Sequence, residues 1–161
     1  FWKWIQRGRK FEKEYLLPRL KNRASAEYVQ LRNKVQNTCN VNLDQYDMYS
    51  QVQFKYNTAG NYFVADQVYV KWGPNPNTGI DEIQDIVIIE DKLSSGTRLT
   101  TNQNAGKRAT SLTVRSVELF PQSSISGNAL TNQLPSINTN DKWLKIFDSE
   151  NGDRISDIVR L

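Results

Sequence analysis

Ile86-Val87-Ile88-Ile89-Glu90-Asp91-Lys92 is the stretch that decides the fold: four consecutive β-branched residues that end abruptly in three charged ones. Side chains of a strand point alternately to its two faces, so a strand that is apolar at every position is covered on both sides. We therefore expect residues 86–89 to form a central strand of a sheet. The same alternation places Glu90 and Lys92 on one face and Asp91 on the other.

Two further β-rich runs precede this strand, at residues 48–56 and 62–72. The turn signal Asn57-Thr58-Ala59-Gly60 joins them, which predicts a β-hairpin. Residues 73–79 are rich in proline, asparagine and glycine and are expected to be a loop, because proline cannot donate a hydrogen bond to a ladder. The three runs therefore predict consecutive strands.

Helical and polar segments flank these strands. Residues 2–35 have apolar side chains at helical spacings, and Pro18 is expected to break or kink this stretch. The Asn-rich residues 37–42 are expected to be a loop. The elements predicted after the central strand are a helix at about 101–111, a strand at 113–120, a polar loop at 122–140 and a hairpin of 143–147 with 154–159. The sequence thus predicts an α/β (α+β) fold, in which N-terminal helices precede a mixed central β-sheet flanked by helices, with a C-terminal β-hairpin.

Composition narrows the class of protein. The chain has 161 residues, of which 38% are hydrophobic and 24% charged, and is expected to be a single globular domain over 1–161. The net charge of +4 favours a polyanionic partner without identifying one. No apolar run is long enough to cross a bilayer.

Since there is no histidine and Cys39 is the only cysteine, disulfide frameworks, zinc fingers and Ser-His or Cys-His nucleophilic sites are excluded. Any metal must be held by oxygen ligands, which suit Mg²⁺ or Mn²⁺.

The end of the central strand is the first candidate for chemistry. Glu90 and Lys92 lie side by side, and phosphodiester hydrolysis needs carboxylates that bind a divalent cation together with a cationic side chain that stabilises the transition state. A second carboxylate must come from an adjacent strand, and Asp66 is well placed because aspartate is disfavoured inside a β run. Asp81 and Asp85 are rivals, although Asp85 lies too close along the same strand to face Glu90 across it. The alternative interpretation is a solvated strand end whose charges blunt an edge.

The order of these features resembles the PD-(D/E)XK, or restriction-endonuclease-like, nuclease superfamily over about residues 5–107. The resemblance implies that Asp66 and Glu90 bind the metal and that Lys92 assists the attacking water or the transition state. It also implies that Glu12, in Arg7-Gly8-Arg9-Lys10-Phe11-Glu12, approaches the metal, and that Gln103, in the following helix, supports the site. The chain departs from the family pattern in having alanine before Asp66 instead of proline, and a longer hairpin from Asp66 to Glu90 than the tightest members have.

The function expected from this resemblance is a Mg²⁺- or Mn²⁺-dependent endonuclease, with DNA favoured over RNA as substrate. Similar compact nuclease domains are the C-terminal toxin domains of bacterial polymorphic toxins. The chain starts at Phe1 without a methionine, so we expect the C-terminal part of a longer polypeptide that is secreted or delivered. Such a domain would act in the cytoplasm of a target cell, and a cognate immunity protein would bind it.

Three alternatives stay open. The first is an RNase of the same fold that acts on tRNA, and the second is a restriction or repair nuclease. The third is a non-catalytic binding module in which Glu90 and Lys92 are surface charges. Four basic residues are candidates for phosphate contacts, although scattered surface charge is the simpler interpretation: Arg98, Lys107, Arg108 and Arg115.

Overall fold

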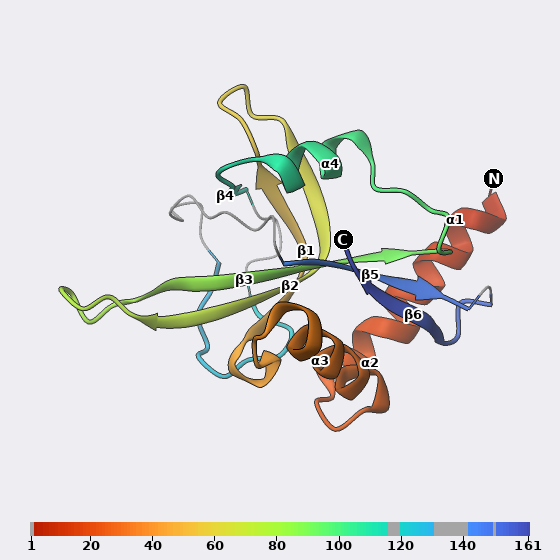
Figure 1. Ribbon diagram of the computed structural model, residues 1–161, viewed down its shortest axis with the longest axis horizontal. Coiled ribbons are helices and arrows are strands. Elements are labelled where there is room, and N and C mark those ends of the chain that lie inside the picture. The colour runs from red at the N-terminus through yellow and green to blue at the C-terminus, as the bar shows by residue number, and fades with distance from the viewer. Residues whose placement is uncertain (1, 116–119, 131–141, 150) are drawn as a thin grey trace.

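The computed structural model of the chain describes residues 2–115, 120–130, 142–149 and 151–161. A six-stranded mixed sheet runs through the molecule in the order β4-β1-β2-β3-β5-β6 (Figure 1). All neighbouring strands are antiparallel except β3 and β5, which are parallel. The strands are β1 (Asp47–Lys55), β2 (Tyr62–Pro74), β3 (Asp81–Lys92), β4 (Thr113–Val114), β5 (Trp143–Asp148) and β6 (Ile155–Arg160). The predicted mixed sheet with helices around it is confirmed.

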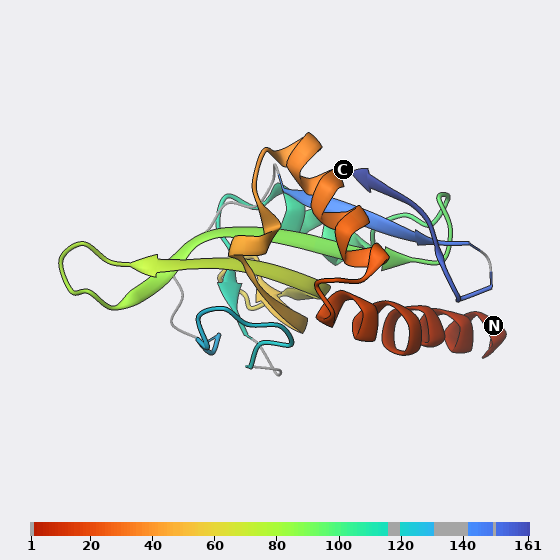
Figure 2. The ribbon, with the colours of Figure 1, turned by 90° about the horizontal axis from the view of Figure 1, so that it is seen from below.

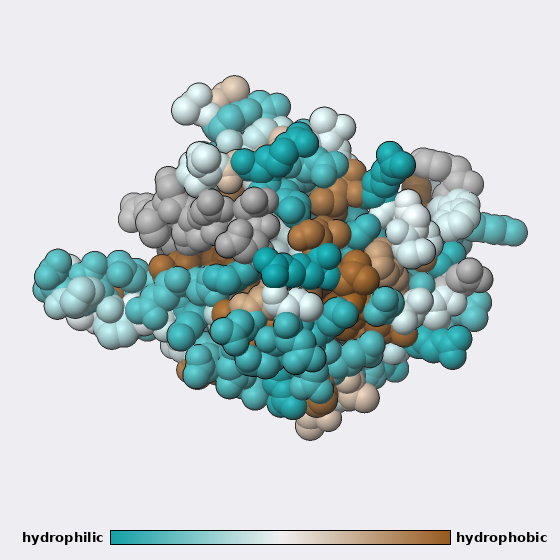
Figure 3. Space-filling view, viewed as in Figure 1, coloured by the Kyte–Doolittle hydropathy of each residue, from teal (hydrophilic) through white to brown (hydrophobic). Residues whose placement is uncertain are grey.

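The central strand is longer than predicted. The pairing of β2 with β3 continues to Pro74 and Asp81, so the two strands leave the sheet as a twisted ribbon whose tip has a hydrophilic surface (Figures 1 and 3). The loop is confined to the short segment between these two strands, whereas the sequence predicted a loop over residues 73–79. Proline is tolerated at this point because Pro74 is the last residue of its strand and need not donate to the ladder.

A helical layer covers one face of the sheet. It consists of α1 (Trp2–Arg9), the π-helix η1 (Lys10–Leu16), α2 (Leu17–Lys21) and α3 (Ala26–Cys39). The first three run on as one continuous rod (Figure 2), so the predicted break at Pro18 is wrong. Pro18 has no N–H to donate, and the turn directly before it is π-helical, with the Leu17 N–H donating to the Glu12 carbonyl five residues back instead of following the regular α-helical pattern.

The ends of α3 also differ from the prediction. The chain turns after Lys21, and the Ser25 hydroxyl begins α3 by accepting a hydrogen bond from the Tyr28 N–H at 3.1 Å. The helix continues to Cys39, two to three residues into the segment expected to be a loop, and ends at Asn40. Asn40 has a left-handed φ of 55°, which is a common way to end a helix.

Helix α4 (Thr101–Arg108) lies on the opposite face (Figure 1). It packs so closely that a Cβ at Gly106 would lie 2.2 Å from the Phe63 ring. Along β3, Val87 and Ile89 pack with the helical layer, and the alternate residues pack on the α4 side. The strand is therefore buried from both sides, as its unbroken apolar run predicts.

The C-terminal half is only partly as expected. Helix α4 ends at Arg108, three residues early. The strand predicted at 113–120 is observed only at Thr113–Val114, and residues 116–119 lie outside the described residues. Part of the predicted loop, 131–140, lies outside them too. The terminal hairpin of β5 and β6 is confirmed. None of the helices in the described ranges is long and apolar enough to span a membrane.

Candidate active site

The site is built where β1 and β2 lose their regular pairing. Gln51 and Asp66 lie opposite each other between two paired positions but are not themselves paired. Gln51 has a φ of 53°, in the left-handed region that residues other than glycine rarely occupy. Tyr49 and Val52 consequently pack on the same face, although residues three apart in a regular strand face opposite sides. The irregularity frees the Asp66 side chain from the alternation and turns it toward the end of β3.

Asp66 is held by the neighbouring backbone. Its Oδ2 accepts a hydrogen bond from the Asp91 N–H at 2.8 Å. Its Oδ1 lies 3.4 Å from Nε2 of Gln51, and the same Nε2 donates to Oε1 of Glu12 on η1. The strained Gln51 thus links a helical carboxylate to a strand carboxylate, which is a typical use of a rare backbone conformation.

Three carboxylates converge at this point. One oxygen each of Glu12, Asp66 and Asp91 lies within 4.8 Å of the other two, the one such acidic group found in the described ranges. Oδ2 of Asp91 accepts a hydrogen bond from Gln67 Nε2 at 2.6 Å, whereas its Oδ1 is buried without a hydrogen-bond partner. A buried carboxylate oxygen without a donor is costly. This oxygen therefore has unused capacity to bind a cation.

Glu90, Lys92 and Gln103 meet on the α4 side of the sheet. Glu90 is fully buried, and its Oε2 accepts a hydrogen bond from Gln103 Nε2 at 2.8 Å. The Gln103 Oε1 accepts from Lys92 Nζ at 3.0 Å and from the Thr100 N–H at 2.9 Å. The capping box of α4 therefore holds the amide that orients both charged groups. Oε1 of Glu90 is a second buried oxygen without a partner.

Mutual repulsion and burial dominate the electrostatics of these acids. Burial, and then the charge of Asp66, raises the pKa of Glu12 to about 7. Burial raises the pKa of Asp66 against the opposing effect of the Asp91 N–H and Lys92. The pKa values of Glu90 and Asp91 also lie well above normal, because both are buried beside Asp66. So many carboxylates in one place are unfavourable without added positive charge.

A second lysine lies beside Lys92. The parallel register of β3 and β5 pairs Lys145 with Glu90. Its Nζ donates to the Thr97 carbonyl at 3.2 Å and lies 4.9 Å from the centre of the Phe147 ring. Burial and the nearby charge of Lys92 lower the pKa of Lys145. In the part of the chain that the structure describes, neither lysine forms an ion pair within 4.0 Å, although the charge of Lys92 acts on the nearby carboxyls.

The site residues predicted from sequence are brought together in two groups that meet at Asp66. Glu12 and Asp66 belong to the carboxylate group, while Glu90, Lys92 and Gln103 are joined by hydrogen bonds on the α4 side. The rival acids lie elsewhere. Asp85 accepts from Lys142 Nζ at 2.5 Å and from the Tyr46 hydroxyl, and Asp81 accepts from Asn128.

Comparison with known protein families, curated proteins and solved structures finds no match. Any functional assignment therefore depends on the geometry and on the sequence resemblance.

A divalent cation fits the residues of this site. Carboxylate oxygens are the ligands that Mg²⁺ and Mn²⁺ prefer, and Glu12, Asp66 and Asp91 supply one each within reach of a shared ion. The buried oxygens without partners, on Asp91 and on Glu90, add to this fit because a bound cation would satisfy them. Glu90 adjoins Asp66 from the other face, although it is not one of the three grouped acids.

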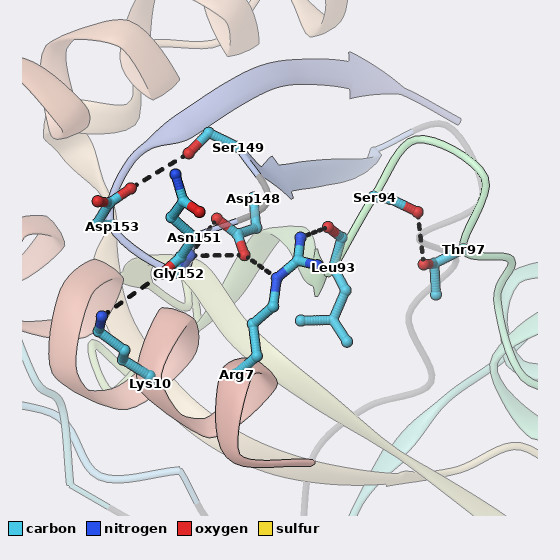
Figure 4. Close-up of polar contacts among 10 residues, drawn as sticks. All are labelled: Arg7, Lys10, Leu93, Ser94, Thr97, Asp148, Ser149, Asn151, Gly152 and Asp153. Atoms are coloured by element: carbon cyan, nitrogen blue, oxygen red, sulfur yellow. Dashed lines mark hydrogen bonds and ion pairs between the residues drawn. The ribbon is translucent and has the colours of Figure 1, made fainter. Parts of the chain in front are cut away.

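An ion pair fixes the helix that carries Glu12. Arg7 donates from Nε to Asp148 Oδ2 at 2.7 Å and from its Nη2 to the Leu93 carbonyl at 2.6 Å (Figure 4). The Asp148 side chain is fully buried and also accepts from the Gly152 N–H. The first helix is thereby attached to the residue that follows Lys92 and to the β5–β6 turn.

Sequence reasoning missed three contributors: Gln51, Asp91 and Lys145. The alternation correctly assigned Asp91 to the face opposite Glu90, but that same face receives the helix with Glu12. An unusual φ at a glutamine leaves no sequence signal. The only available signal for Lys145 was a charged residue inside the otherwise apolar run of β5.

Proposed function

We propose that this protein is a Mg²⁺- or Mn²⁺-dependent endonuclease that hydrolyses phosphodiester bonds. The observation that supports this most is the grouping of Glu12, Asp66 and Asp91 beside Glu90 and Lys92, which both hydrogen-bond to Gln103. Metal-binding carboxylates next to a cationic side chain are what hydrolysis of a phosphodiester requires. The order of helix with Glu12, strand with Asp66, strand ending in Glu-x-Lys and helix with Gln103 further supports a restriction-endonuclease-like core.

Each side chain has a distinct role in this proposal. When bound, a divalent cation would supply positive charge that stabilises the transition state of the displacement. The carboxylates of Glu12, Asp66 and Asp91 bind that cation, and Glu90 completes the site from the α4 face. Lys92 donates a hydrogen bond to the attacking water or to a phosphoryl oxygen as negative charge develops there. Gln103 keeps Glu90 and Lys92 at a fixed separation because its amide bonds to both.

Plasmid DNA and total tRNA, each incubated with and without Mg²⁺ or Mn²⁺, test the proposal. We expect metal-dependent cutting that falls by about a hundredfold or more in Lys92→Ala and in Asp66→Asn. Asp81→Asn is the matched control, because Asp81 lies on the β2–β3 ribbon, where its side chain accepts a hydrogen bond from Asn128. DNA is the substrate we favour, and tRNA cleavage would select the RNase alternative. A folded protein that cuts neither polymer would be the binding module instead.

The biological setting we propose is that of a bacterial toxin domain with a cognate immunity protein, and it depends on the sequence resemblance. The domain would be delivered to the cytoplasm of a competing cell. Induced expression without an inhibitor should then arrest growth, and Lys92→Ala should abolish the arrest. Growth that is unaffected by an enzyme active in vitro would favour a restriction or repair nuclease.

A further inference from the structure

A groove opens next to the proposed catalytic residues. It lies between the tip of the β1–β2 hairpin and the start of α4, has a volume of about 610 Å³, and is lined by residues 59–64 with Thr100, Asn102 and Gln103. This volume lies in the range of typical ligand sites. Gln103 also bonds to Glu90 and Lys92. The groove therefore begins one side chain away from the proposed chemistry.

The two sequence segments that contain the lining residues have a net positive charge. These segments, 52–65 and 97–115, contain no aspartate or glutamate. They carry five of the 21 basic residues: Lys55, Arg98, Lys107, Arg108 and Arg115. The other 16 basic residues are spread among all 17 acidic ones, so the remainder of the chain has no positive excess. Such segregation creates a local field that attracts a polyanion.

An aromatic side chain of the groove lining carries an arginine over its ring. Tyr62 is 37% exposed, and the Arg115 guanidinium carbon lies 4.4 Å from the centre of its ring. The Arg115 N–H donates to the Gln53 carbonyl at 2.7 Å, which fixes the backbone at this position. An exposed ring beside a guanidinium binds a nucleobase by stacking and a phosphate by charge.

This combination selects a form of nucleic acid. A ring can stack on a base only if that base has left its own stack, so bases inside a duplex offer no face to Tyr62. The visible surface of α4 is largely hydrophilic (Figure 3), and the lining of the groove contains the amides of Asn61 and Asn102. These features suit an unpaired strand better than the face of a protein.

We propose that this groove binds a single-stranded segment of the substrate, with a base on Tyr62 and a phosphate on Arg115. The inference rests on the proposed nuclease function and deepens it, because it states that the bond to be cut lies next to unpaired nucleotides. The strand would enter along the hairpin and pass Gln103 to reach Lys92.

Fluorescence anisotropy tests the groove separately from cleavage. The probes are fluorescein-labelled oligothymidylate, oligouridylate and a blunt duplex of mixed sequence, all titrated in EDTA so that no metal-dependent cutting occurs. We expect the single strands to bind more tightly than the duplex. Tyr62→Ala should weaken single-strand binding by about tenfold, which corresponds to the loss of one stacked base, and Tyr62→Phe should stay within about twofold of the wild type.

Charge is tested with a matched pair of arginines. Arg115→Ala should weaken binding. It should also reduce the slope of the logarithm of the binding constant against the logarithm of salt concentration by about the amount expected for one phosphate contact. Arg19→Ala is the control, because Arg19 also lies over a tyrosine ring, at 4.1 Å from Tyr15, but in the helical layer on the other face of the sheet. It should bind the probes as the wild type does. Circular dichroism and thermal melting establish that each variant is folded.

The outcomes separate the two proposals. Single-strand binding that is absent in the wild type, or is the same in Tyr62→Ala as in the wild type, would overturn the groove inference. So would an equal loss of duplex and single-strand binding in that variant. Failure of the nuclease proposal shows differently, as an absence of metal-dependent cleavage while oligonucleotide binding still depends on Tyr62 and Arg115.

Discussion

At the scale of single residues, the two lysines of the site differ in how they are held. Lys92 donates to an amide that is itself fixed by a helix cap, whereas Lys145 donates to the backbone carbonyl of Thr97. Both acceptors are neutral oxygens, so the charge of each ammonium group is not compensated by its hydrogen-bond partner, and the two lysines differ in that only the partner of Lys92 also holds Glu90. We infer that Lys92 is positioned for the reacting phosphate and that Lys145 is free to bind a neighbouring phosphate of the strand.

Lys145→Ala should therefore raise KM for the nucleic acid by about tenfold and change kcat little, since a charged hydrogen bond of about 1.5 kcal/mol is lost in binding. Lys145→Arg should restore most of the affinity. Steady-state cleavage at several salt concentrations measures this. In the alanine variant, the slope of log KM against log salt concentration should fall by about the amount expected for one phosphate contact. The same removal of charge at the exposed Lys21, in Lys21→Ala, is the control. A fall in kcat alone would contradict a phosphate-binding role.

Glu12 gives a pH dependence whose sign follows from its raised pKa. A carboxyl that titrates near 7 in the folded state and near 4.5 when unfolded holds its proton better in the folded protein. Its contribution to the free energy of unfolding is complete below about pH 4.5 and is lost as the pH rises through about 7. In EDTA, urea unfolding of the wild type should show this loss relative to Glu12→Gln, which cannot ionise. Parallel pH profiles of the two proteins would show that Glu12 titrates normally.

Residues of the site were predictable from sequence where one strand decides their orientation. Alternation within β3 places Glu90 beside Lys92, and the strand with Asp66 follows from its own β-rich pattern. Asp91 could not be assigned in this way, because its neighbours come from η1 and β2. Likewise, Lys145 lies beside Glu90 only because two strands far apart in the sequence pair in parallel.

At the scale of elements, the ends of four strands were predicted more accurately than those of β3, β4 and the helices. A strand pattern is local, and the ends of β1, β2, β5 and β6 are near those expected. The end of the first helix depends on the π-helical turn before Pro18, which is not encoded by spacing. The extension of β3 depends on its partner β2 rather than on its own composition. Both are tertiary effects that override local preference.

The first helix depends on a partly buried ion pair, and its loss should be measurable. Arg7→Ala leaves the fully buried Asp148 without a cation, which costs about 3 kcal/mol when a buried pair is broken. Urea unfolding measures the change. The matched control is Arg19→Ala, which breaks a more exposed pair with Glu27 at 3.6 Å and should cost at most about 1 kcal/mol. Equal losses in the two variants would mean that the pair of Arg7 and Asp148 does not anchor α1.

At the scale of the whole molecule, the proposed site joins the two layers through the sheet. The helical layer contributes Glu12, the α4 face contributes the group of Glu90, Lys92 and Gln103, and Asp66 lies between them at the irregularity in β2. A cation bound there would connect η1, β2 and β3. It should therefore stabilise the whole domain rather than one loop.

Thermal unfolding with increasing Mn²⁺ or Mg²⁺ tests this coupling. A ligand that binds only the folded state adds about 2.7 kcal/mol when its concentration is a hundred times its Kd, so the melting temperature of the wild type should rise with metal concentration. Asp66→Asn removes the carboxylate shared by both groups and should abolish the rise. Asp81→Asn should keep it, because Asp81 lies out on the β2–β3 ribbon. Since the carboxylates must be ionised to bind the cation, the rise should be larger at about pH 8 than at about pH 6. A rise of equal size in all three proteins would place the metal elsewhere on the chain and remove the main support for the nuclease proposal.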